Sequence, residues 1–317
     1  MKKYIYFHIC AIGCYERVLH HILTQLQSSD ILTEIEEFRC FITGKTTEDI
    51  EKAHSILCVY HPCAVIHISD KEEALLAHER WTLHSLLHVC RKWSEEDQDH
   101  AILYLHSKGV SHNLDLHGCG IPDWITTMLC GLLSYRRLCL QYMERGTDVL
   151  GSYYSTEGQR PHFSGNYWWA RSSHIGRRLS LIGPDYYDPE YWILSPPDTN
   201  AIAIMRDGHL HKTNFAECIP ISQYLSDVSF TPLQPSQSQE IEIEILSSSI
   251  ISIHIGLDHQ WISCHVPCTM DPFPLSLSHL SSLDPLPGIS KMVRIHTSDN
   301  QVRFFLENQW IQSKEQL

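Results

Sequence analysis

Short apolar runs alternate with helical patterns over the first half of the chain, and this alternation restricts the fold more than any other feature. Residues 4–10 and 101–105 are rich in aromatic and β-branched residues, as buried strands are. Strands that alternate with helices form βαβ units, so the sequence predicts an α/β fold with a mainly parallel sheet flanked by helices. The predicted strands are 4–10, 38–43, 64–68, 101–105 and 149–153, and the predicted helices are 15–26, 46–54, 71–93 and 123–145.

A change in composition divides the chain. Residues 231–239 read TPLQPSQSQ, which is typical of a linker. Beyond them, isoleucine and glutamate alternate over residues 240–245, the period of a strand with one solvent-facing side. We therefore predict a larger domain over 1–225, a linker over 226–239 and a small β-rich appendage over 240–317, for which no motif indicates a role.

Charge and composition exclude several kinds of partner. The 317 residues carry a formal net charge of −13, so we expect no nucleic acid partner, and any phosphorylated ligand needs positive charge gathered locally. No apolar run approaches the roughly 20 residues of a membrane-spanning helix. The 12 cysteines form no CxxC pair and no Asn-x-Ser/Thr sequon occurs, which favours a cytoplasmic protein.

Five short segments carry most of the residues suited to chemistry. They are YLHSKG at 104–109, DW at 123–124, DVLG at 148–151, HFSGNYWWAR at 162–171 and EYWI at 190–193. In this order and spacing they resemble a family of GT-A-like glycosyltransferases of bacteria and large DNA viruses, over residues 1 to about 220. The resemblance implies a GT-A-like, Rossmann-like fold. It also implies transfer of a sugar from a UDP-, GDP- or dTDP-sugar to a glycan or another hydroxyl acceptor, as in glycan biosynthesis.

The loop after strand 101–105 is the first candidate for a donor site, because ligands of parallel sheets bind beyond the carboxyl ends of the strands. Lys108 can neutralise a diphosphate there, and Gly109 permits close backbone approach. A strand-ending turn with a solvated lysine is the alternative, and the resemblance favours the donor site. By the resemblance, the loop after the first strand meets the base and ribose, with Tyr15 stacking. The predicted donor-binding residues are His8, Ala11, Tyr15, His106, Lys108, Gly109 and Asp148.

Metal dependence stays open at the level of sequence. Many GT-A enzymes hold a divalent ion with an Asp-x-Asp motif where this chain has His106-Ser107-Lys108. Either the histidine and lysine replace the ion, or Asp115 or Asp148 holds Mn²⁺ or Mg²⁺. The sequence slightly favours metal independence.

The HFSGNYWWAR segment suits sugar recognition. An asparagine offers a donor and acceptors, and indole faces pack against the C–H face of a pyranose, although we expect at least one of the two tryptophans to be core. The histidine contacts the donor or is structural. By the resemblance, the donor/acceptor cleft is lined by His162, Ser164, Gly165, Asn166, Trp168 and Trp169.

Glu190 is the predicted general base, which takes the proton of the acceptor hydroxyl in a single, inverting displacement. Aromatic neighbours are expected to desolvate it and raise its pKa. Asp185 and Asp188 are competitors, and a helix-start carboxylate is the structural alternative. Glu79 and Thr82 match the family pattern weakly, and we expect them to pack the helix.

Other classes of protein remain as alternatives. A catalytically silent protein that binds carbohydrate or nucleotide sugar on the same fold is the main one. A zinc protein would use the 22 histidines and 12 cysteines, but HERWT at 78–82 lacks the second histidine of HExxH. Phosphate-binding GxxxxGK[ST] and GxGxxG loops and the GxSxG elbow of serine hydrolases are absent.

Overall fold

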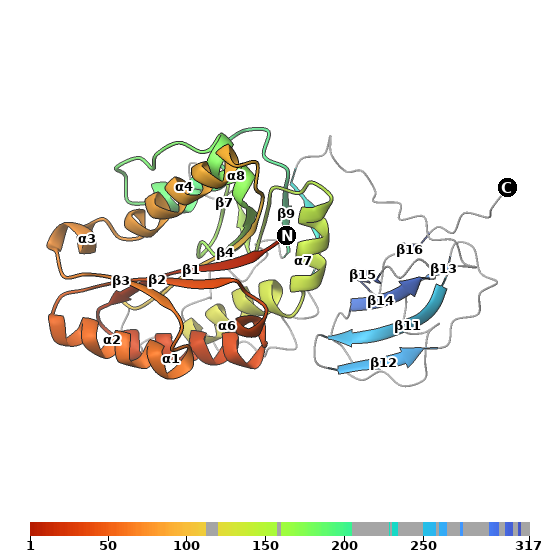
Figure 1. Ribbon diagram of the computed structural model, residues 1–317, viewed down its shortest axis with the longest axis horizontal. Helices are drawn as coiled ribbons and strands as arrows, with labels where there is room; N and C mark the ends of the chain where they lie inside the picture. The colour runs from red at the N-terminus through yellow and green to blue at the C-terminus, as the bar shows by residue number, and fades with distance from the viewer. Residues whose placement is uncertain are drawn as a thin grey trace.

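The computed structural model contains one large mixed sheet with helices on both faces (Figure 1). The structure describes residues 1–111, 120–156, 160–204, 228, 230–233, 250–257, 260–264, 273–274, 292–297, 302–306 and 310–311. The eight strands lie in the order β10-β9-β5-β8-β4-β1-β2-β3. Their bounds are β1 Lys3–Ala11, β2 Glu37–Gly44, β3 Val65–Ser69, β4 Ala101–His106, β5 Val149–Gly151, β8 Trp168–Arg171, β9 Ala201–Ala203 and β10 Thr231–Pro232.

The central part of this sheet is parallel, which confirms the predicted α/β class. β1 pairs in parallel with both β2 and β4, and β2 pairs in parallel with β3. β8 runs antiparallel to β4 and to β5, while β5 and β9 are parallel and β10 is antiparallel to β9. The carboxyl ends of β1, β2, β3, β4 and β5 therefore share one edge of the sheet.

Two layers of helices cover the sheet. α1, α2 and α6 lie on one face, and α4 and α8 on the other (Figure 1). The helix bounds are α1 Tyr15–Ser28, α2 Thr47–Tyr60, α3 Glu72–Leu76, α4 Arg80–Glu95, α6 Gly120–Leu133, α7 Arg136–Glu144, α8 Ser172–Arg178 and α9 Asp188–Trp192, with a 3-10 turn at Ile31–Thr33.

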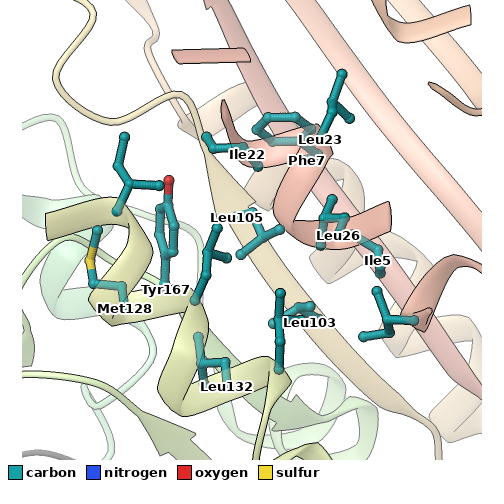
Figure 2. Close-up of a cluster of buried hydrophobic side chains, with 14 of the residues drawn as sticks. Ile5, Phe7, Ile22, Leu23, Leu26, Leu103, Leu105, Met128, Leu132 and Tyr167 are labelled. Atoms are coloured by element: carbon teal, nitrogen blue, oxygen red, sulfur yellow. The ribbon is translucent and has the colours of Figure 1, made fainter. Parts of the chain in front are cut away.

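The alternation along the strands divides the core between the two faces. Ile5 and Phe7 of β1 pack with Leu23 of α1 and Met128 of α6 (Figure 2). The residue between the first two, Tyr6, packs on the other side with the residues of α4. Burial of each large apolar side chain contributes roughly 1.5–3 kcal/mol, so both layers of helices are held by the sheet.

The predicted helix over 71–93 is two helices, α3 and α4. His78 has a left-handed backbone, with φ of 49°, and this ends the helical path between them. Glu79 then occupies the position before the first turn of α4, where its carboxyl leaves the helix surface and bonds with Tyr104 of β4 at 2.8 Å. The break removes no apolar residue from the pattern. The apolar periodicity of the sequence therefore runs across this point and does not reveal it.

The predicted helix over 123–145 is also divided, into α6 and α7. Tyr135 interrupts it with a non-helical backbone, and Arg136 donates to the carbonyl of Leu133 at 3.2 Å. The same guanidinium is buried and pairs with the partly exposed Glu34 at 2.6 Å, so an ion pair holds the residue at the bend.

The carboxy-terminal part contains β structure, as expected, in its described residues. A four-stranded antiparallel sheet has the order β12-β11-β14-β15, and β13 pairs with β16. Within the predicted linker, β10 pairs with β9 and extends the large sheet. The predicted strand over 240–245 lies outside the described residues, and the division into two domains stays a prediction. The bounds are β11 Ile250–Leu257, β12 Gln260–Cys264, β13 Phe273–Pro274, β14 Met292–Thr297, β15 Val302–Leu306 and β16 Trp310–Ile311, with β6 Tyr154–Ser155 and β7 His162–Phe163 forming a separate pair.

Candidate functional site

A cavity of about 220 Å³ opens beyond the carboxyl ends of β1 and β4, the edge at which the sequence placed the donor site. Four segments line it: the end of β1 with the loop after it, the loop after β4, the start of α4, and the turn that enters α9. Among the predicted site residues, this cavity brings together His8, His106, Lys108, Gly109 and Glu190.

A partly buried ion pair lies in the cavity. The Nζ of Lys108 lies 2.7 Å from Oε1 of Glu190, and the two side chains are 20% and 19% exposed. Lys108 also lies 5.3 Å from the ring centroid of Trp124, so the DW segment gives this ammonium a cation–π contact. The predicted donor lysine and the predicted base are therefore partners of each other.

The ion pair sets the protonation states of both groups. Burial alone would raise the pKa of the Glu190 carboxyl, but the Lys108 ammonium outweighs burial and lowers it. Burial would lower the pKa of Lys108, and Glu190 outweighs it in the same way and raises it. The sequence predicted a raised pKa for Glu190. The structure reverses that direction, because the sequence could not show the lysine beside it.

A second pair, Glu79 and His106, also lines the cavity and is largely buried. Nε2 of His106 donates to the carbonyl of Gly165 at 2.8 Å, so Nδ1 is the nitrogen that faces Oε1 of Glu79, 3.1 Å away. Burial lowers the pKa of His106 to about 3, with Lys108 adding to the effect, and burial raises the pKa of Glu79. A neutral imidazole that donates from Nε2 has a lone pair at Nδ1, and in that state we expect the carboxyl of Glu79 to supply the proton between the two residues.

The other oxygen of Glu79 anchors the HFSGN segment. Oε2 accepts from Tyr104 at 2.8 Å and from the side-chain amide of Asn166 at 2.7 Å. Sequence analysis assigned Glu79 to helix packing and so missed its place in the cavity. Its weak match to the family pattern was the only signal that could have found it.

Both polar atoms of the Asn166 side chain make hydrogen bonds within the protein. Its Nδ2 also lies 3.3 Å from the carbonyl of Pro189, and its Oδ1 accepts from the indole of Trp168 at 2.8 Å. The residue is completely buried and its backbone is left-handed, with φ of 55°. Asn166 therefore positions Glu79 and the α9 turn, and the structure does not present it to the cavity.

The remaining predicted cleft residues lie behind the cavity wall. Trp168 and Trp169 are both completely buried, on opposite faces of β8, so both are core residues. His162 is buried, with Nδ1 3.1 Å from the carbonyl of Arg160. Ser164 is buried, and its backbone N–H donates to the carbonyl of Tyr153 at 2.9 Å. Gly165 acts through its carbonyl, which holds His106.

The amino-terminal donor residues are divided by the structure. His8 lines the cavity, and its Nδ1 lies 2.9 Å from the hydroxyl of Thr82, a buried residue of α4. Burial lowers the pKa of His8 to about 4. Ala11 and Tyr15 are buried in the core beneath α1, so the predicted stacking of Tyr15 on a base is not available in this structure.

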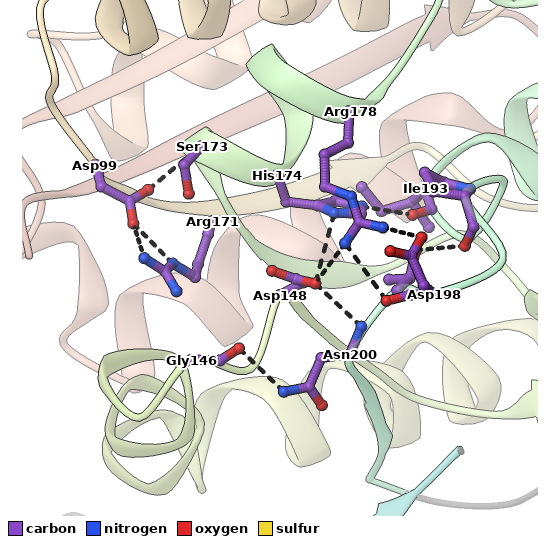
Figure 3. Close-up of polar contacts among 12 residues, drawn as sticks. Asp99, Gly146, Asp148, Arg171, Ser173, His174, Arg178, Ile193, Asp198 and Asn200 are labelled. Carbon is purple, nitrogen blue, oxygen red and sulfur yellow. Dashed lines mark hydrogen bonds and ion pairs between the residues drawn. The ribbon is translucent and has the colours of Figure 1, made fainter. Parts of the chain in front are cut away.

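Asp148 directly precedes β5 and so lies at the amino ends of the parallel strands, the edge opposite the cavity; Figure 3 shows its contacts. Its carbonyl accepts from Arg171, which pairs with Ala101 at the amino end of β4. Its Oδ2 accepts from Arg178 at 3.1 Å and from the backbone of Asn200 at 3.0 Å. The structure therefore separates Asp148 from the other predicted donor residues and gives it a structural role.

The two competitors for Glu190 are engaged elsewhere. Asp188 accepts from the backbone of Asp185 at 2.9 Å and pairs with Arg160 at 3.4 Å. Neither aspartate lines the cavity.

The described residues contain one of the two predicted metal ligands, Asp148. Asp115, the other predicted metal ligand, lies outside them. Within them, no three histidine, cysteine, aspartate or glutamate side chains converge as a metal site would require. Among the histidines of α4, His84 accepts from the backbone of Ile182 at 3.2 Å. No helix in this part of the chain is long and apolar enough to span a bilayer.

Comparison with known proteins gives a family but no activity. No curated protein sequence matches the chain. A solved 4-diphosphocytidyl-2C-methyl-D-erythritol synthase is 11% identical, over 71% of this chain and 96% of that chain, with a TM-score of 0.34. S. aureus TarS 1-349 is 12% identical, over 60% of this chain and 54% of that chain, with a TM-score of 0.33. Likeness at this level carries no information about activity.

A family model covers most of the candidate site. The model of a domain of unknown function matches residues 13–191, more than half of the chain. This span contains both pairs of the cavity, Lys108 with Glu190 and Glu79 with His106. The chain therefore belongs to the family described as domain of unknown function DUF8361.

Proposed function

We propose that the cavity binds a nucleotide sugar and that the protein transfers its sugar to a hydroxyl of a glycan or similar acceptor. The observation that carries this proposal is the Lys108–Glu190 pair, an ammonium and a carboxylate 2.7 Å apart in a cavity at the carboxyl ends of β1 and β4. The resemblance of YLHSKG, HFSGNYWWAR and EYWI to GT-A-like glycosyltransferases supports it.

Lys108 supplies the positive charge that a diphosphate needs in a chain of net charge −13. It is partly buried and already holds an anion, so a donor diphosphate would take the place of the Glu190 carboxylate at Nζ. The cavity of about 220 Å³ is smaller than the roughly 300–1,000 Å³ of typical small-molecule sites. The proposal therefore puts the diphosphate and the sugar in the cavity and leaves the nucleoside outside it.

Release of Glu190 from Lys108 would convert the carboxylate into a base. Without the ammonium, burial is the dominant influence and raises the pKa of Glu190. The carboxylate then takes the proton of the acceptor hydroxyl as that oxygen forms its bond to the anomeric carbon. The bond from the anomeric carbon to the diphosphate breaks, and its electron pair leaves with the diphosphate. One base and one displacement give inversion.

A catalytically silent binding protein is the second candidate, and the same ion pair favours it. A carboxylate whose pKa is lowered by an adjacent ammonium is a weak base. If ligands never separate the pair, the cavity binds without turnover.

Thermal unfolding with UDP-, GDP-, dTDP- and CMP-sugars, each with and without Mn²⁺, tests donor binding. A ligand at 100 times its Kd stabilises the folded state by about 2.7 kcal/mol, which raises Tm by a few degrees. We expect one nucleotide class to do so in the wild type and Lys108→Met to lose the effect. Lys45→Met is the matched control, because Lys45 follows the neighbouring strand β2 and is exposed.

Glu190→Gln separates the two candidates. Because it removes the anion that competes for Lys108, this variant should bind donor at least as tightly as the wild type while transfer is lost. Transfer by Glu190→Gln at the wild-type rate would refute the assignment of the base. An unchanged donor affinity in Lys108→Met would refute the donor site. Donor binding without turnover in the wild type would select the silent alternative.

A further inference from the structure

Two adjacent tyrosines stand exposed at the mouth of the cavity. Tyr186 and Tyr187 are 69% and 57% exposed, and both belong to the cavity lining. Most of the large aromatic side chains in the described residues are buried, and many of them are completely buried. Exposed aromatic surface that borders a cavity is a common mark of a ligand contact.

Ring contacts hold these two side chains in place. The ring of Tyr186 meets that of His78 at 5.4 Å and that of Tyr187 at 5.0 Å, both nearly perpendicular. The row continues through Tyr191, 6.4 Å from Tyr187, to His162 at 5.4 Å. In each perpendicular pair the edge of one ring meets a face of the other, so a contact covers at most one ring face, and both tyrosines stay largely exposed.

The backbone beneath the tyrosines is fixed as well. Arg80, at the start of α4, donates to the carbonyl of Gly183 at 2.8 Å and also to that of Asp185. Asp188 accepts from the backbone of Asp185 at 2.9 Å and closes the turn from the other side. The exposed rings therefore stand on a braced segment.

The same turn carries Glu190. The backbone N–H of Glu190 donates to the carbonyl of Tyr187 at 3.0 Å, and that of Tyr191 lies 3.3 Å from it. A ring stacked on Tyr187 would thus be held at a fixed position relative to the Glu190 carboxyl.

We propose that Tyr186 and Tyr187 form an acceptor shelf, which binds the apolar C–H face of a pyranose and turns one of its hydroxyls toward Glu190. The assignment rests on the proposed function, because it takes Glu190 as the group that meets the acceptor. A pyranose fits the two residues, since it pairs an apolar face with a rim of hydroxyls that phenol groups can bond. A nucleotide base is the competing occupant. The direct link from Tyr187 to Glu190 favours the acceptor.

Saturation-transfer NMR on the full chain tests the shelf, with methyl glycosides of glucose, galactose, mannose, N-acetylglucosamine and xylose as probes. In the wild type, we expect the ring C–H protons of one face of at least one glycoside to receive the strongest saturation. Tyr186→Ala/Tyr187→Ala should weaken that glycoside about tenfold, and Tyr186→Phe/Tyr187→Phe should keep most of the affinity. Leu181→Ala is the control, because Leu181 is 68% exposed nearby and does not line the cavity. All these side chains are exposed, so Tm should not change.

Three results would overturn the shelf. They are glycoside binding by the double alanine variant within twofold of wild type, no glycoside binding by the wild type, and loss of saturation on the uridine protons of a UDP-sugar in place of the glycoside. Lys108→Met separates this from the proposed function. If that variant keeps its affinity for UDP-sugar, the donor site fails while the glycoside data still decide the shelf. If it loses UDP-sugar and the double alanine variant keeps the glycoside, the shelf alone fails.

Discussion

Replacing Glu79 with glutamine or with alanine tests whether a single proton joins Glu79 to His106. If Glu79 is protonated, glutamine reproduces its bonds. The amide oxygen accepts from Tyr104 and Asn166, as Oε2 does now, and the amide nitrogen donates to Nδ1 of His106. We therefore expect Glu79→Gln to cost less than about 1 kcal/mol, since no buried group loses a partner.

Alanine at the same position leaves three buried groups without Glu79. These are the hydroxyl of Tyr104, the amide of Asn166 and Nδ1 of His106, of which Asn166 keeps its 3.3 Å contact with the carbonyl of Pro189. Each unsatisfied buried group costs about 1–3 kcal/mol, so Glu79→Ala should cost about 3–5 kcal/mol. The two variants differ by a factor of at least tens in the folded-to-unfolded ratio.

Urea unfolding at pH 7, followed by tryptophan fluorescence, measures the difference. Infrared spectroscopy provides a direct readout, because the carbonyl stretch of a protonated carboxylic acid should disappear in Glu79→Gln. Glu72→Gln is the control, since Glu72 is exposed on the neighbouring α3. Equal destabilisation by glutamine and alanine would show that Glu79 is ionised and His106 protonated, and would refute the reasoning.

Three further predictions concern other positions. The pKa of His8 falls from the ordinary 6.5 to about 4, so the unfolded chain takes up a proton that the folded chain does not; His8 alone should therefore lower stability by about 3 kcal/mol as the pH drops from 6.5 to 4, and His8→Gln should remove that part of the slope in urea titrations. Gly165→Ala should cost about 2 kcal/mol or more in the same assay, because φ is 90° and the new Cβ would meet Sδ of Met128. Asp148→Asn should lower stability by about 1–2 kcal/mol yet keep the thermal shift with donor, because Asp148 binds Arg178 and Asn200 away from the cavity.

The large sheet could be predicted because its strands are local patterns. The runs at 4–10, 38–43, 64–68 and 101–105 became β1, β2, β3 and β4, with no end shifted by more than one residue. Helix ends depended on tertiary contacts and were harder to place. Nothing in the apolar spacing of 71–93 records that His78 adopts a left-handed backbone. The pairing of β10 with β9 was equally hidden, because a two-residue edge strand has no pattern of its own.

The cavity could be located from the sequence, but the partners within it could not. The rule that ligands bind at the carboxyl ends of strands was enough to find Lys108. The side chain that meets it, Glu190, lies 82 residues further along the chain, and this partner reverses the direction of its pKa shift. Residue type alone also led to the wrong placement of Trp168 and Trp169 in the cleft, because a tryptophan suits a sugar-binding surface and a hydrophobic core equally well.

HFSGNYWWAR, the segment that carries the most specific part of the resemblance, positions residues of the cavity without lining it. Gly165 orients His106 through its carbonyl, and Asn166 holds both Glu79 and the backbone of Pro189, next to Glu190. Each of these contacts is made to a residue in or next to the cavity, while residues 162–170 themselves are buried. The Glu79–His106 and Lys108–Glu190 pairs therefore depend on the same residue, Asn166. A shift of Asn166 would move Glu79 and the start of the turn that carries Glu190 together. A long, specific sequence motif can in this way mark the residues that position a site, while the groups that would meet the ligand come from shorter segments around it.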